Sequence, residues 1–362
     1  MKPKPHSITM AHVSIPKTAG QWKVGGKGGA DTLKYSEQPA PEIGDNQVLV
    51  KLRGASLNYR DIVISRGHYP WGFKPGIVPG SDGAGIILAV GKHVTRFRPG
   101  DKVVTMLNPQ HIAGPVTRGI SGFGTGASVD GTFRSVGVFN EHGLVAMPQG
   151  LTFTEAATLC CAGLTAWNAL FGLPGKQVSA GQWVLTQGTG GVSIFAVQFA
   201  KAVGARVIAT TSSSEKGKLL EKLGVDHIIN YRETPEWGSE VRKLTGGDGV
   251  DVIVEVAGPI SIKQSVASVK LDGLIVVVGS VGSGDAKEMP SLLDCWMNLF
   301  TTRGVWVGNR LQMEDMCRAV EGNLEKLRPV LDPKVFSLDQ LKEAYEYLES
   351  GKHQAKVGIE IE

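Results

Sequence analysis

The stretch W-V-L-T-Q-G-T-G-G-V-S-I-F-A-V-Q-F-A-K-A-V, from Trp183 to Val203, contains a short apolar run, a cluster of glycines and a segment with helical spacing of apolar residues. The apolar run predicts a buried strand, and the spacing after the glycines predicts a helix with one core-facing side. Glycines permit a tight turn and a close approach to a ligand, and the N–H groups at a helix N-terminus attract an anion. Strand, glycine turn and helix in this order predict a site for the pyrophosphate of a dinucleotide. The residues predicted to contact it are Gly188, Gly190, Gly191 and Val192, while the small Ser193 replaces the third glycine of the usual motif.

A glycine cluster alone is also compatible with a flexible turn, so the residues after the helix decide the interpretation. Residues 206–211 predict a second strand, which makes the unit βαβ. Where an NAD site usually carries an acidic residue, about twenty residues past the motif, this chain reads T-S-S-S-E-K over residues 211–216. Small hydroxyls and a lysine suit a 2′-phosphate, so Ser212, Ser213 and Lys216 predict NADP(H) as the cofactor. In the alternative interpretation, Ser213 only caps the next helix and Lys216 is only solvated.

Length and charge bound the class of protein. The chain has 362 residues, enough for two domains, and a formal net charge of +4 without a long basic run, so no nucleic-acid partner is expected. No apolar stretch approaches the roughly 18 residues of a membrane span, and the polar N-terminus does not resemble a secretory signal. The four cysteines, Cys160, Cys161, Cys295 and Cys317, predict reduced thiols in a cytoplasmic protein. Three histidines, His111, His142 and His353, are scattered and receive no role.

The character of the chain changes near residue 154. Before it, short strand-like runs separated by glycine and proline predict a β-rich unit, in which residues 108–135 form a long surface loop that shapes the substrate pocket. After an apolar helix over residues 155–170, strands and helices alternate. The six predicted strands are Val184–Leu185, Val207–Thr210, His227–Ile229, Val252–Val256, Leu274–Val278 and Val305–Val307. The pattern predicts an α/β protein with a doubly wound, parallel six-stranded Rossmann sheet. Residues 330–362 are too few for a third domain and are expected to complete the first sheet.

Several ordered motifs resemble the medium-chain dehydrogenase/reductase superfamily, and its zinc-independent quinone-reductase-like and enoyl-reductase-like branch in particular. They are N-Y-R-D at 58–61, R-G-H-Y-P at 66–70, P-G-S-D-G-A-G at 79–85, P-G-D-K-V at 99–103, A-G-L-T-A-W at 162–167 and D-H-I-I-N-Y at 226–231. The resemblance implies a GroES-like catalytic domain built from residues 1–154 and 330–362. It implies a Rossmann NADP-binding domain over residues 155–329, with the cofactor in the cleft between the two.

The chain departs from the zinc alcohol dehydrogenases of that superfamily. Those enzymes place a zinc-binding cysteine where this chain has Asn58, and a His-Glu pair where it has Ser81 and Asp82. Neither an asparagine nor a serine is a normal zinc ligand. The carboxylates of Asp61 and Asp82 alone make a poor zinc site, and they are expected to hold loops together. We therefore expect no metal.

Without a metal, a substrate carbonyl needs another electrophile. Hydride addition to the β-carbon of an enone leaves an enolate that hydrogen-bond donors stabilise, and a proton must then reach the α-carbon. By resemblance to the enoyl reductases, Tyr69 is the candidate proton donor, and Asn58 is the candidate donor to the oxyanion or to the cofactor ribose. The alternatives are that Tyr69 is a packed aromatic residue and that the Asn58 amide stabilises a turn.

The resemblance and the positions of the strand ends imply further cofactor contacts. The candidates are Thr165, Tyr231, Ala257, Gly279, Ser280, Val281, Asn309 and Arg310. Thr165 alternatively caps its own helix, and Arg310 is alternatively a solvated loop charge. The apolar run Val305–Val307 is expected to be an edge strand that pairs with a second copy in a homodimer.

Together these observations predict an NADPH-dependent, zinc-independent oxidoreductase acting on an α,β-unsaturated carbonyl compound or a quinone, with a small-molecule substrate as its partner. Three alternatives stay open at this point: a metal-free alcohol or aldehyde dehydrogenase, a redox-neutral tailoring enzyme, and an NADPH-binding protein without turnover.

Overall fold

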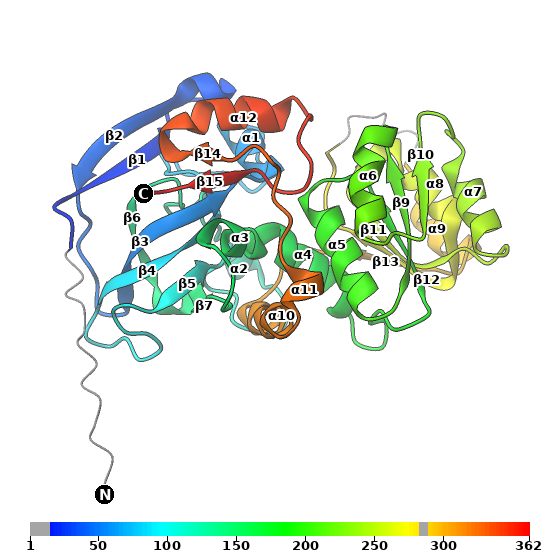
Figure 1. Ribbon diagram of the computed structural model, residues 1–362, viewed down its shortest axis with the longest axis horizontal. Helices are drawn as coiled ribbons and strands as arrows, with labels where there is room; N and C mark the ends of the chain where they lie inside the picture. The colour runs from blue at the N-terminus through cyan, green and yellow to red at the C-terminus, as the bar shows by residue number, and fades with distance from the viewer. Residues whose placement is uncertain (1–14, 282–288) are drawn as a thin grey trace, which may run out of the picture.

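The computed structural model describes residues 15–281 and 289–362, which form two domains lying side by side (Figure 1). The first, here called the parallel-sheet domain, contains the glycine-rich stretch. The second, here called the β-rich domain, takes strands from both ends of the chain. The predicted pairing of a doubly wound sheet with a β-rich domain is therefore confirmed.

The parallel-sheet domain has six strands in the order β10-β9-β8-β11-β12-β13, with all neighbours parallel. The order runs outward in both directions from the central pair β8 and β11, which is the doubly wound arrangement. Their bounds are β8 Trp183–Gln187, β9 Arg206–Thr211, β10 His227–Asn230, β11 Val250–Glu255, β12 Val269–Val277 and β13 Thr301–Gly304.

Both faces of this sheet are buried, which explains why its central strands are continuously apolar. Val184 and Val207 face one hydrophobic cluster, and Leu185 and Ile208, one residue further along each strand, face another. The flanking helices are α5 Gly191–Ala202, α6 Ser214–Lys222, α7 Trp237–Leu244, α8 Ile262–Ser268, α9 Leu292–Met297, α10 Arg310–Gly322 and α11 Leu324–Leu327. The apolar stretch before β8 is helical, as α3 Phe153–Ala157, a π-helical turn Leu159–Gly163 and α4 Leu164–Phe171.

The sixth strand does not lie where the sequence pattern places it. The prediction of Val305–Val307 is wrong, because β13 ends at Gly304 and the next residues leave the sheet. The Asn168 side chain of α4 donates to the Val307 carbonyl at 2.7 Å, and Val307 adopts a left-handed φ of 53°. The Val305 N–H still donates to the Val277 carbonyl of β12, and the apolar run packs against the core cluster that includes α4 instead of extending the edge strand.

The β-rich domain contains a seven-stranded sheet in the order β14-β15-β3-β4-β5-β7, with β6 also pairing with β3, and a separate β1–β2 hairpin. The bounds are β1 Thr18–Val24, β2 Leu33–Pro39, β3 Gln47–Ser56, β4 Asp82–Val90, β5 Lys102–Thr105, β6 Val136–Asn140, β7 Leu144–Ala146, β14 Phe336–Ser337 and β15 Gly358–Glu360. Its helices are α1 Tyr59–Ser65, α2 Arg118–Ser121 and α12 Leu341–Glu349. Strand β15 pairs antiparallel with β3, so the end of the chain joins the sheet formed by its beginning.

The segment 108–135 is only partly the surface loop that its composition predicts. It carries the short helix α2, and its second half is buried, with Phe133 fully inaccessible. Glycine makes this close packing possible, because a Cβ at Gly126 or Gly131 would lie 2.5 Å or 2.1 Å from the Gly80 carbonyl oxygen. The segment is therefore anchored at its C-terminal end and exposed mainly over residues 113–119.

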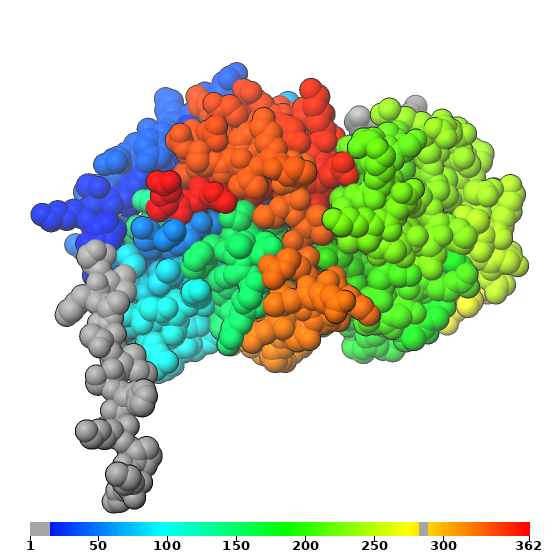
Figure 2. Space-filling model, viewed as in Figure 1, coloured from blue at the N-terminus to red at the C-terminus, as the bar shows by residue number. Residues whose placement is uncertain are grey.

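The C-terminal residues lie against both domains, as the red and orange surface in Figure 2 shows between the blue and green parts. Residues 351–357, here called the strap, connect α12 to β15 and pass over the glycine turn. Within residues 15–281 and 289–362, no helix combines the length and apolar character needed to cross a lipid bilayer.

Candidate functional site

The glycine turn after β8 has the geometry of an anion-binding loop. Gly188 has a left-handed φ of 72°, which a residue with a side chain adopts only under strain, and Gly190 is the N-cap of α5. A Cβ at either glycine would meet no protein atom, so the space in front of this backbone is open. The Ser193 hydroxyl donates to the Gln187 carbonyl at 2.6 Å and holds the first turn of α5 against β8. These features fit the pyrophosphate of a dinucleotide.

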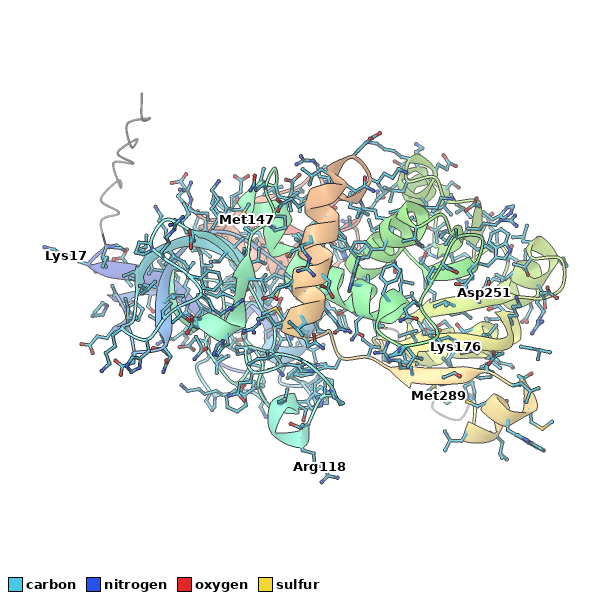
Figure 3. All side chains as sticks on the ribbon, turned by 90° about the horizontal axis from the view of Figure 1, so that it is seen from below. Lys17, Arg118, Met147, Lys176, Asp251 and Met289 are labelled. Atoms are coloured by element: carbon cyan, nitrogen blue, oxygen red, sulfur yellow. The ribbon has the colours of Figure 1, made fainter. Side chains whose placement is uncertain are left out.

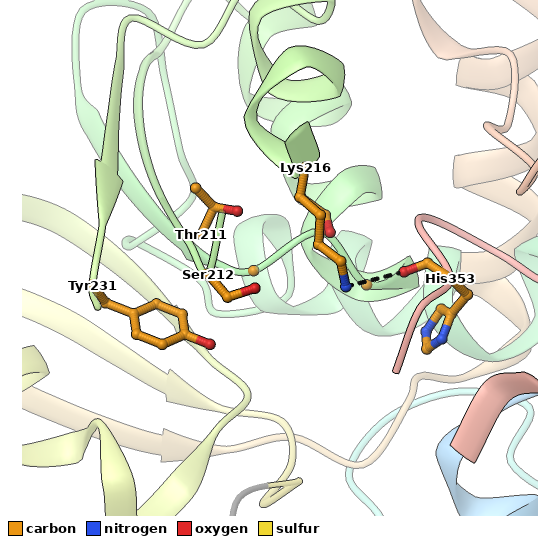
Figure 4. Close-up of a pocket in the computed structure, with 8 residues that line it drawn as sticks. Thr211, Ser212, Lys216, Tyr231 and His353 are labelled. Atoms are coloured by element: carbon orange, nitrogen blue, oxygen red, sulfur yellow. Dashed lines mark hydrogen bonds between the residues drawn. The ribbon is translucent and has the colours of Figure 1, made fainter. Parts of the chain in front are cut away.

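A cavity of about 150 Å³ opens beside this turn, at the carboxyl ends of β8 and β9. Whole ligand sites typically measure ~300–1,000 Å³, so this cavity has the size of one end of a longer site. Its lining residues are Gly188, Thr189, Gly190, Thr211, Ser212, Lys216, Tyr231 and His353. Figure 4 shows the side chains of Ser212, Lys216 and Tyr231 around one space, with His353 approaching from the strap.

The electrostatics of the cavity favour an anion. The Lys216 ammonium donates to the carbonyls of Gly351 and His353, at 2.7 and 3.4 Å, and these bonds hold it at the cavity wall. Burial, with the positive charge of Arg232, lowers the pKa of Lys216 below its ordinary value. Burial, with the charge of Lys216, likewise lowers the pKa of His353. A bound phosphate would offset both effects, because it supplies the missing counter-charge.

Ser213 and Ser212 differ in what their hydroxyls do. The Ser213 hydroxyl accepts from the backbone N–H of Lys216 and caps α6, which is the alternative that the sequence left open for this residue. The Ser212 hydroxyl lines the cavity. Helix capping therefore occupies one of the two candidate serines, and the other faces the site.

The tips of β11 and β12 form the next part of the same edge. Glu255 is fully buried and accepts from the Gln187 amide at 2.7 Å and from the Ser265 hydroxyl at 2.5 Å. The same carboxylate accepts from the N–H of Ala257, and the N–H of Val281 donates to the Val256 carbonyl. A Cβ at Gly258 would lie 2.4 Å from the Ser280 hydroxyl, so the two tips are in direct contact. Ala257, Ser280 and Val281 thus lie together, next to Gly279.

Asn58 lies at the centre of a second cluster, in the β-rich domain. It is the N-cap of α1 and forms a capping box with Asp61, whose carboxylate accepts from the Asn58 N–H at 2.8 Å. The Asn58 side chain contacts Ser81 and Lys356. Lys356 is only 3% exposed, and its ammonium donates to the Leu57 carbonyl, to Asn58 Oδ1 and to Asp82 Oδ2, at 2.6, 2.7 and 3.0 Å.

The residues of this cluster do not fit a zinc ion. An ammonium occupies the centre of the cluster, and it has no lone pair to offer a metal. Within residues 15–281 and 289–362, no three His, Cys, Asp or Glu side chains are grouped as metal ligands would be.

Tyr69 lies in the β-rich domain among aromatic and cationic side chains. Its ring lies 5.2 Å from the Arg60 guanidinium and 5.3 Å from the Trp71 ring. Trp71 also contacts Trp306, at 5.7 Å, which follows β13 in the other domain. The alternative of a packed aromatic ring is therefore observed for Tyr69, and the Trp71–Trp306 contact joins the two domains.

The structure brings some of the predicted cofactor residues together and leaves others apart. Ser212, Lys216 and Tyr231 converge on the cavity beside the glycine turn. Asn309 instead caps α10 by accepting from the Gln312 N–H, and Arg310 contacts His142 of the β-rich domain at 3.1 Å. Thr165 lies buried within α4.

Two residues of the site were missed by the sequence analysis, and both belong to the strap. His353 received no role, yet it lines the cavity, and Lys356 was not considered, yet it organises the Asn58 cluster. The available signal was a lysine within the otherwise apolar run A-K-V-G-I at residues 355–359, since a charged residue in such a place needs a partner.

Two family models match the chain. One, described as the alcohol dehydrogenase GroES-like domain, matches residues 44–149, and the other, described as zinc-binding dehydrogenase, matches residues 191–322. A zinc-type alcohol dehydrogenase-like protein of Schizosaccharomyces pombe is 44% identical over 337 residues, covering 92% of this chain and 96% of that protein.

Solved structures agree with these matches. A protein from Sinorhizobium meliloti 1021, provisionally named an alcohol dehydrogenase, is 37% identical with a TM-score of 0.87, covering 96% of this chain and 100% of its own. An NAD-dependent alcohol dehydrogenase is 31% identical with a TM-score of 0.84, over 95% and 100% of the two chains. A quinone oxidoreductase from Pseudomonas syringae is 26% identical with a TM-score of 0.79, over 94% and 99%.

Proposed function

Because this chain belongs to the medium-chain dehydrogenase/reductase superfamily of oxidoreductases, we propose that it is a zinc-independent, NADPH-dependent reductase of enones, enoyl compounds or quinones. The observation that carries the proposal is the buried Lys356 ammonium, bonded to Asn58 and Asp82 in the cluster where zinc dehydrogenases hold their metal. A site organised around a fixed cation and an amide stabilises negative charge through hydrogen bonds and charge rather than through a metal–oxygen bond.

The preference for NADPH rests on the cavity beside the glycine turn. A 2′-phosphate would meet the Lys216 ammonium, the Ser212 hydroxyl and the Tyr231 side chain, with His353 next to Lys216 in the cavity lining. No carboxylate lines this cavity within residues 15–281 and 289–362, so nothing described there would repel a phosphate. The similar NAD-dependent alcohol dehydrogenase shows that names within the superfamily do not settle the cofactor, so the proposal depends on these side chains.

Each residue of the site has its own part in the chemistry. NADPH, held by the glycine turn and the cavity beside it, would supply a hydride to the β-carbon of the substrate, and the carbon–carbon π electrons would move to the carbonyl oxygen to give an enolate. An N–H of Asn58 stabilises the negative oxygen of the resulting enolate, and the Tyr69 hydroxyl delivers a proton to the α-carbon. The tyrosinate is then reprotonated from water, so that one hydride and one proton are consumed in each turnover. The Arg60 guanidinium beside the Tyr69 ring stabilises the tyrosinate in the interval.

Steady-state kinetics test the proposal directly. NADPH oxidation is followed by its absorbance with an enone, a quinone and an aldehyde in turn, before and after treatment with a chelator, alongside metal analysis of the purified protein. We expect turnover of the enone or quinone, no effect of the chelator and less than ~0.1 zinc per chain. Stoichiometric zinc together with loss of activity on chelation would refute it. Oxidation of alcohols with NADP⁺ as the main activity would favour the second candidate, a dehydrogenase, which the names of the similar proteins support.

We further propose that the active form is a homodimer assembled through the edge of the parallel sheet. Strand β13 pairs with β12 on one side, and helix α9 beside it carries exposed apolar residues. They are Leu292, Leu293, Trp296 and Met297, of which Leu292 is 91% exposed, and the exposed Leu299 follows the helix. Figure 3 shows this helix projecting at the end of the molecule near Met289. Among the strands of the described residues, only β12 pairs with β13, and a sheet edge beside an apolar patch suits a second copy related by a two-fold axis.

A further inference from the structure

Four side chains in the Asn58 cluster form a closed ring of hydrogen bonds. Lys356 donates to Asn58 Oδ1 and Asp82 Oδ2, at 2.7 and 3.0 Å. The Asn58 amide nitrogen donates to the Ser81 hydroxyl at 3.3 Å, and that hydroxyl lies 3.4 Å from Asp82 Oδ1. All four residues are at least nine-tenths buried. Water therefore competes little for these bonds.

The ring fixes which end of the Asn58 amide faces which neighbour. An ammonium only donates, so the carbonyl oxygen of the amide, and not its nitrogen, must face Lys356. A flipped amide would place its own N–H groups against the N–H groups of Lys356, with no acceptor between them. The Ser81 hydroxyl would then no longer accept a hydrogen bond from the amide nitrogen. The nitrogen is consequently directed away from the lysine. Within the described part of the chain, Ser81 is its one acceptor, which leaves the second N–H available to a ligand.

We infer that Lys356 is a positioning residue, which orients the Asn58 amide so that its free N–H donates to the substrate oxyanion. This inference rests on the proposed function, because it assigns a task to the Asn58 donor of that reaction. Lys356 itself does not touch the substrate, since its three N–H groups already have acceptors in Leu57, Asn58 and Asp82.

The stem of Lys356 also joins this ring to the cofactor loop. Its Cδ lies 2.5 Å from the position that a Cβ on Gly191 would occupy, so the stem crosses the N-terminus of α5. The neighbouring Ala355 N–H donates to the Thr189 carbonyl at 2.7 Å. The strap therefore fixes the backbone of Lys356 on the phosphate loop while its ammonium fixes the amide. One residue thereby aligns the donor to the oxyanion with the loop that carries the cofactor.

A double-mutant cycle separates positioning from a purely structural role. Lys356→Met alone would leave the buried Asp82 carboxylate without its partner and risks unfolding. The paired change Lys356→Met with Asp82→Asn keeps the apolar stem beside Gly191 and removes both charges. This neutral pair is introduced into the wild-type chain and into Asn58→Ala, with Lys352→Met on the exposed part of the strap as the matched control.

In the wild-type background we expect the neutral pair to lower kcat by ~10²-fold, as the loss of one oxyanion donor does, with NADPH affinity changed less than ~3-fold. In the Asn58→Ala background, where kcat has already fallen, the pair lowers it no further than ~3-fold, because the two changes act on one amide. Lys352→Met leaves kcat unchanged. Equal losses of kcat in both backgrounds, or no loss in either, would overturn the inference.

A measurement without turnover keeps this test separate from the proposed function. With ¹⁵N-asparagine labelling, the side-chain N–H signals of Asn58 are identified by their absence in Asn58→Ala. We expect the neutral pair to shift both signals and to reduce the difference between their chemical shifts, because the amide then has no fixed orientation. Unshifted signals contradict the positioning role even if the wild type reduces enones. Shifted signals support it even if the enzyme proves to act on another carbonyl substrate.

Discussion

Replacement of Lys216 by methionine tests the cofactor site most directly. The Lys216 ammonium lines the cavity beside the glycine turn together with Ser212 and Tyr231, and it is anchored to the carbonyls of Gly351 and His353. Methionine keeps the length and the apolar stem and removes the charge. NADH lacks the 2′-phosphate, so the change should weaken the binding of NADPH and leave the binding of NADH as it was.

The magnitude follows from Coulomb attraction in a partly buried site. Two unit charges 4 Å apart attract by ~1 kcal/mol in water and by ~4 kcal/mol at an effective dielectric constant of 20. Because Lys216 is only partly buried at the wall of this cavity, we expect an intermediate attraction of ~2–3 kcal/mol between its ammonium and the phosphate. Turning toward a phosphate weakens one hydrogen bond of the ammonium, to the carbonyl of Gly351 or His353, at a cost of ~1 kcal/mol. The net ~1–2 kcal/mol corresponds to a ~5–30-fold rise in the Kd for NADPH.

Fluorescence titration of both cofactors measures this difference at two salt concentrations. Lys218→Met is the matched control, because Lys218 lies on the same helix and pairs with the exposed Glu215, outside the cavity. We expect the control to retain the wild-type preference, and the advantage of the wild type over Lys216→Met to shrink at high salt. Equal weakening of NADH and NADPH by Lys216→Met, or no weakening of either, would refute the assignment of this cavity to the 2′-phosphate.

Three further predictions concern catalysis, pH and assembly. Tyr69→Phe should lower kcat by ~10²–10⁴-fold with unchanged NADPH affinity, measured by stopped-flow absorbance, whereas a wild-type kcat would mean that the ring only packs. Burial raises the pKa of Asp61 to about 6 despite the opposing charge of Arg60, so the native state holds a proton that the unfolded state releases near pH 4. The free energy of unfolding should therefore fall by up to ~3 kcal/mol from pH 4 to pH 6 in urea titrations, and Asp61→Asn should flatten this trend. Trp296→Glu on the exposed face of α9 should halve the mass seen by light scattering, and an unchanged dimer would exclude this face.

The architecture was predictable because its signals are local. The central strands of the parallel sheet are short apolar runs, and the glycine turn marks where β8 passes into α5. The sixth strand was misplaced because Val305–Val307 is as apolar as a strand but packs against the core, where the Asn168 side chain donates to the Val307 carbonyl. An apolar run reports burial, and both a strand and a packed turn are buried.

The candidate site was predictable only in part, for the same physical reason. Lys216 and Tyr231 follow the strands that end at the cavity, so their distance along the chain from the glycine turn indicates their place. His353 and Lys356 reach the site from the other end of the chain. Lys356 stands 298 residues from Asn58, and no periodicity or spacing connects the two. The pairing of β15 with β3 brings these distant side chains together, so their contact appears only in the fold and not in the sequence pattern.

In the metal-free site that we propose, the ring around Asn58 opposes conversion to a metal site by a single substitution. Replacing Asn58 by cysteine would place a thiol beside an ammonium that already neutralises Asp82. A zinc ion entering there would have to displace Lys356 from its three acceptors, and a buried lysine without a partner costs ~3–5 kcal/mol. Removing Lys356 first leaves Asp82 with the same problem. The amide, the carboxylate and the ammonium therefore form one cooperative unit, in which the amide keeps its orientation only while both charges remain.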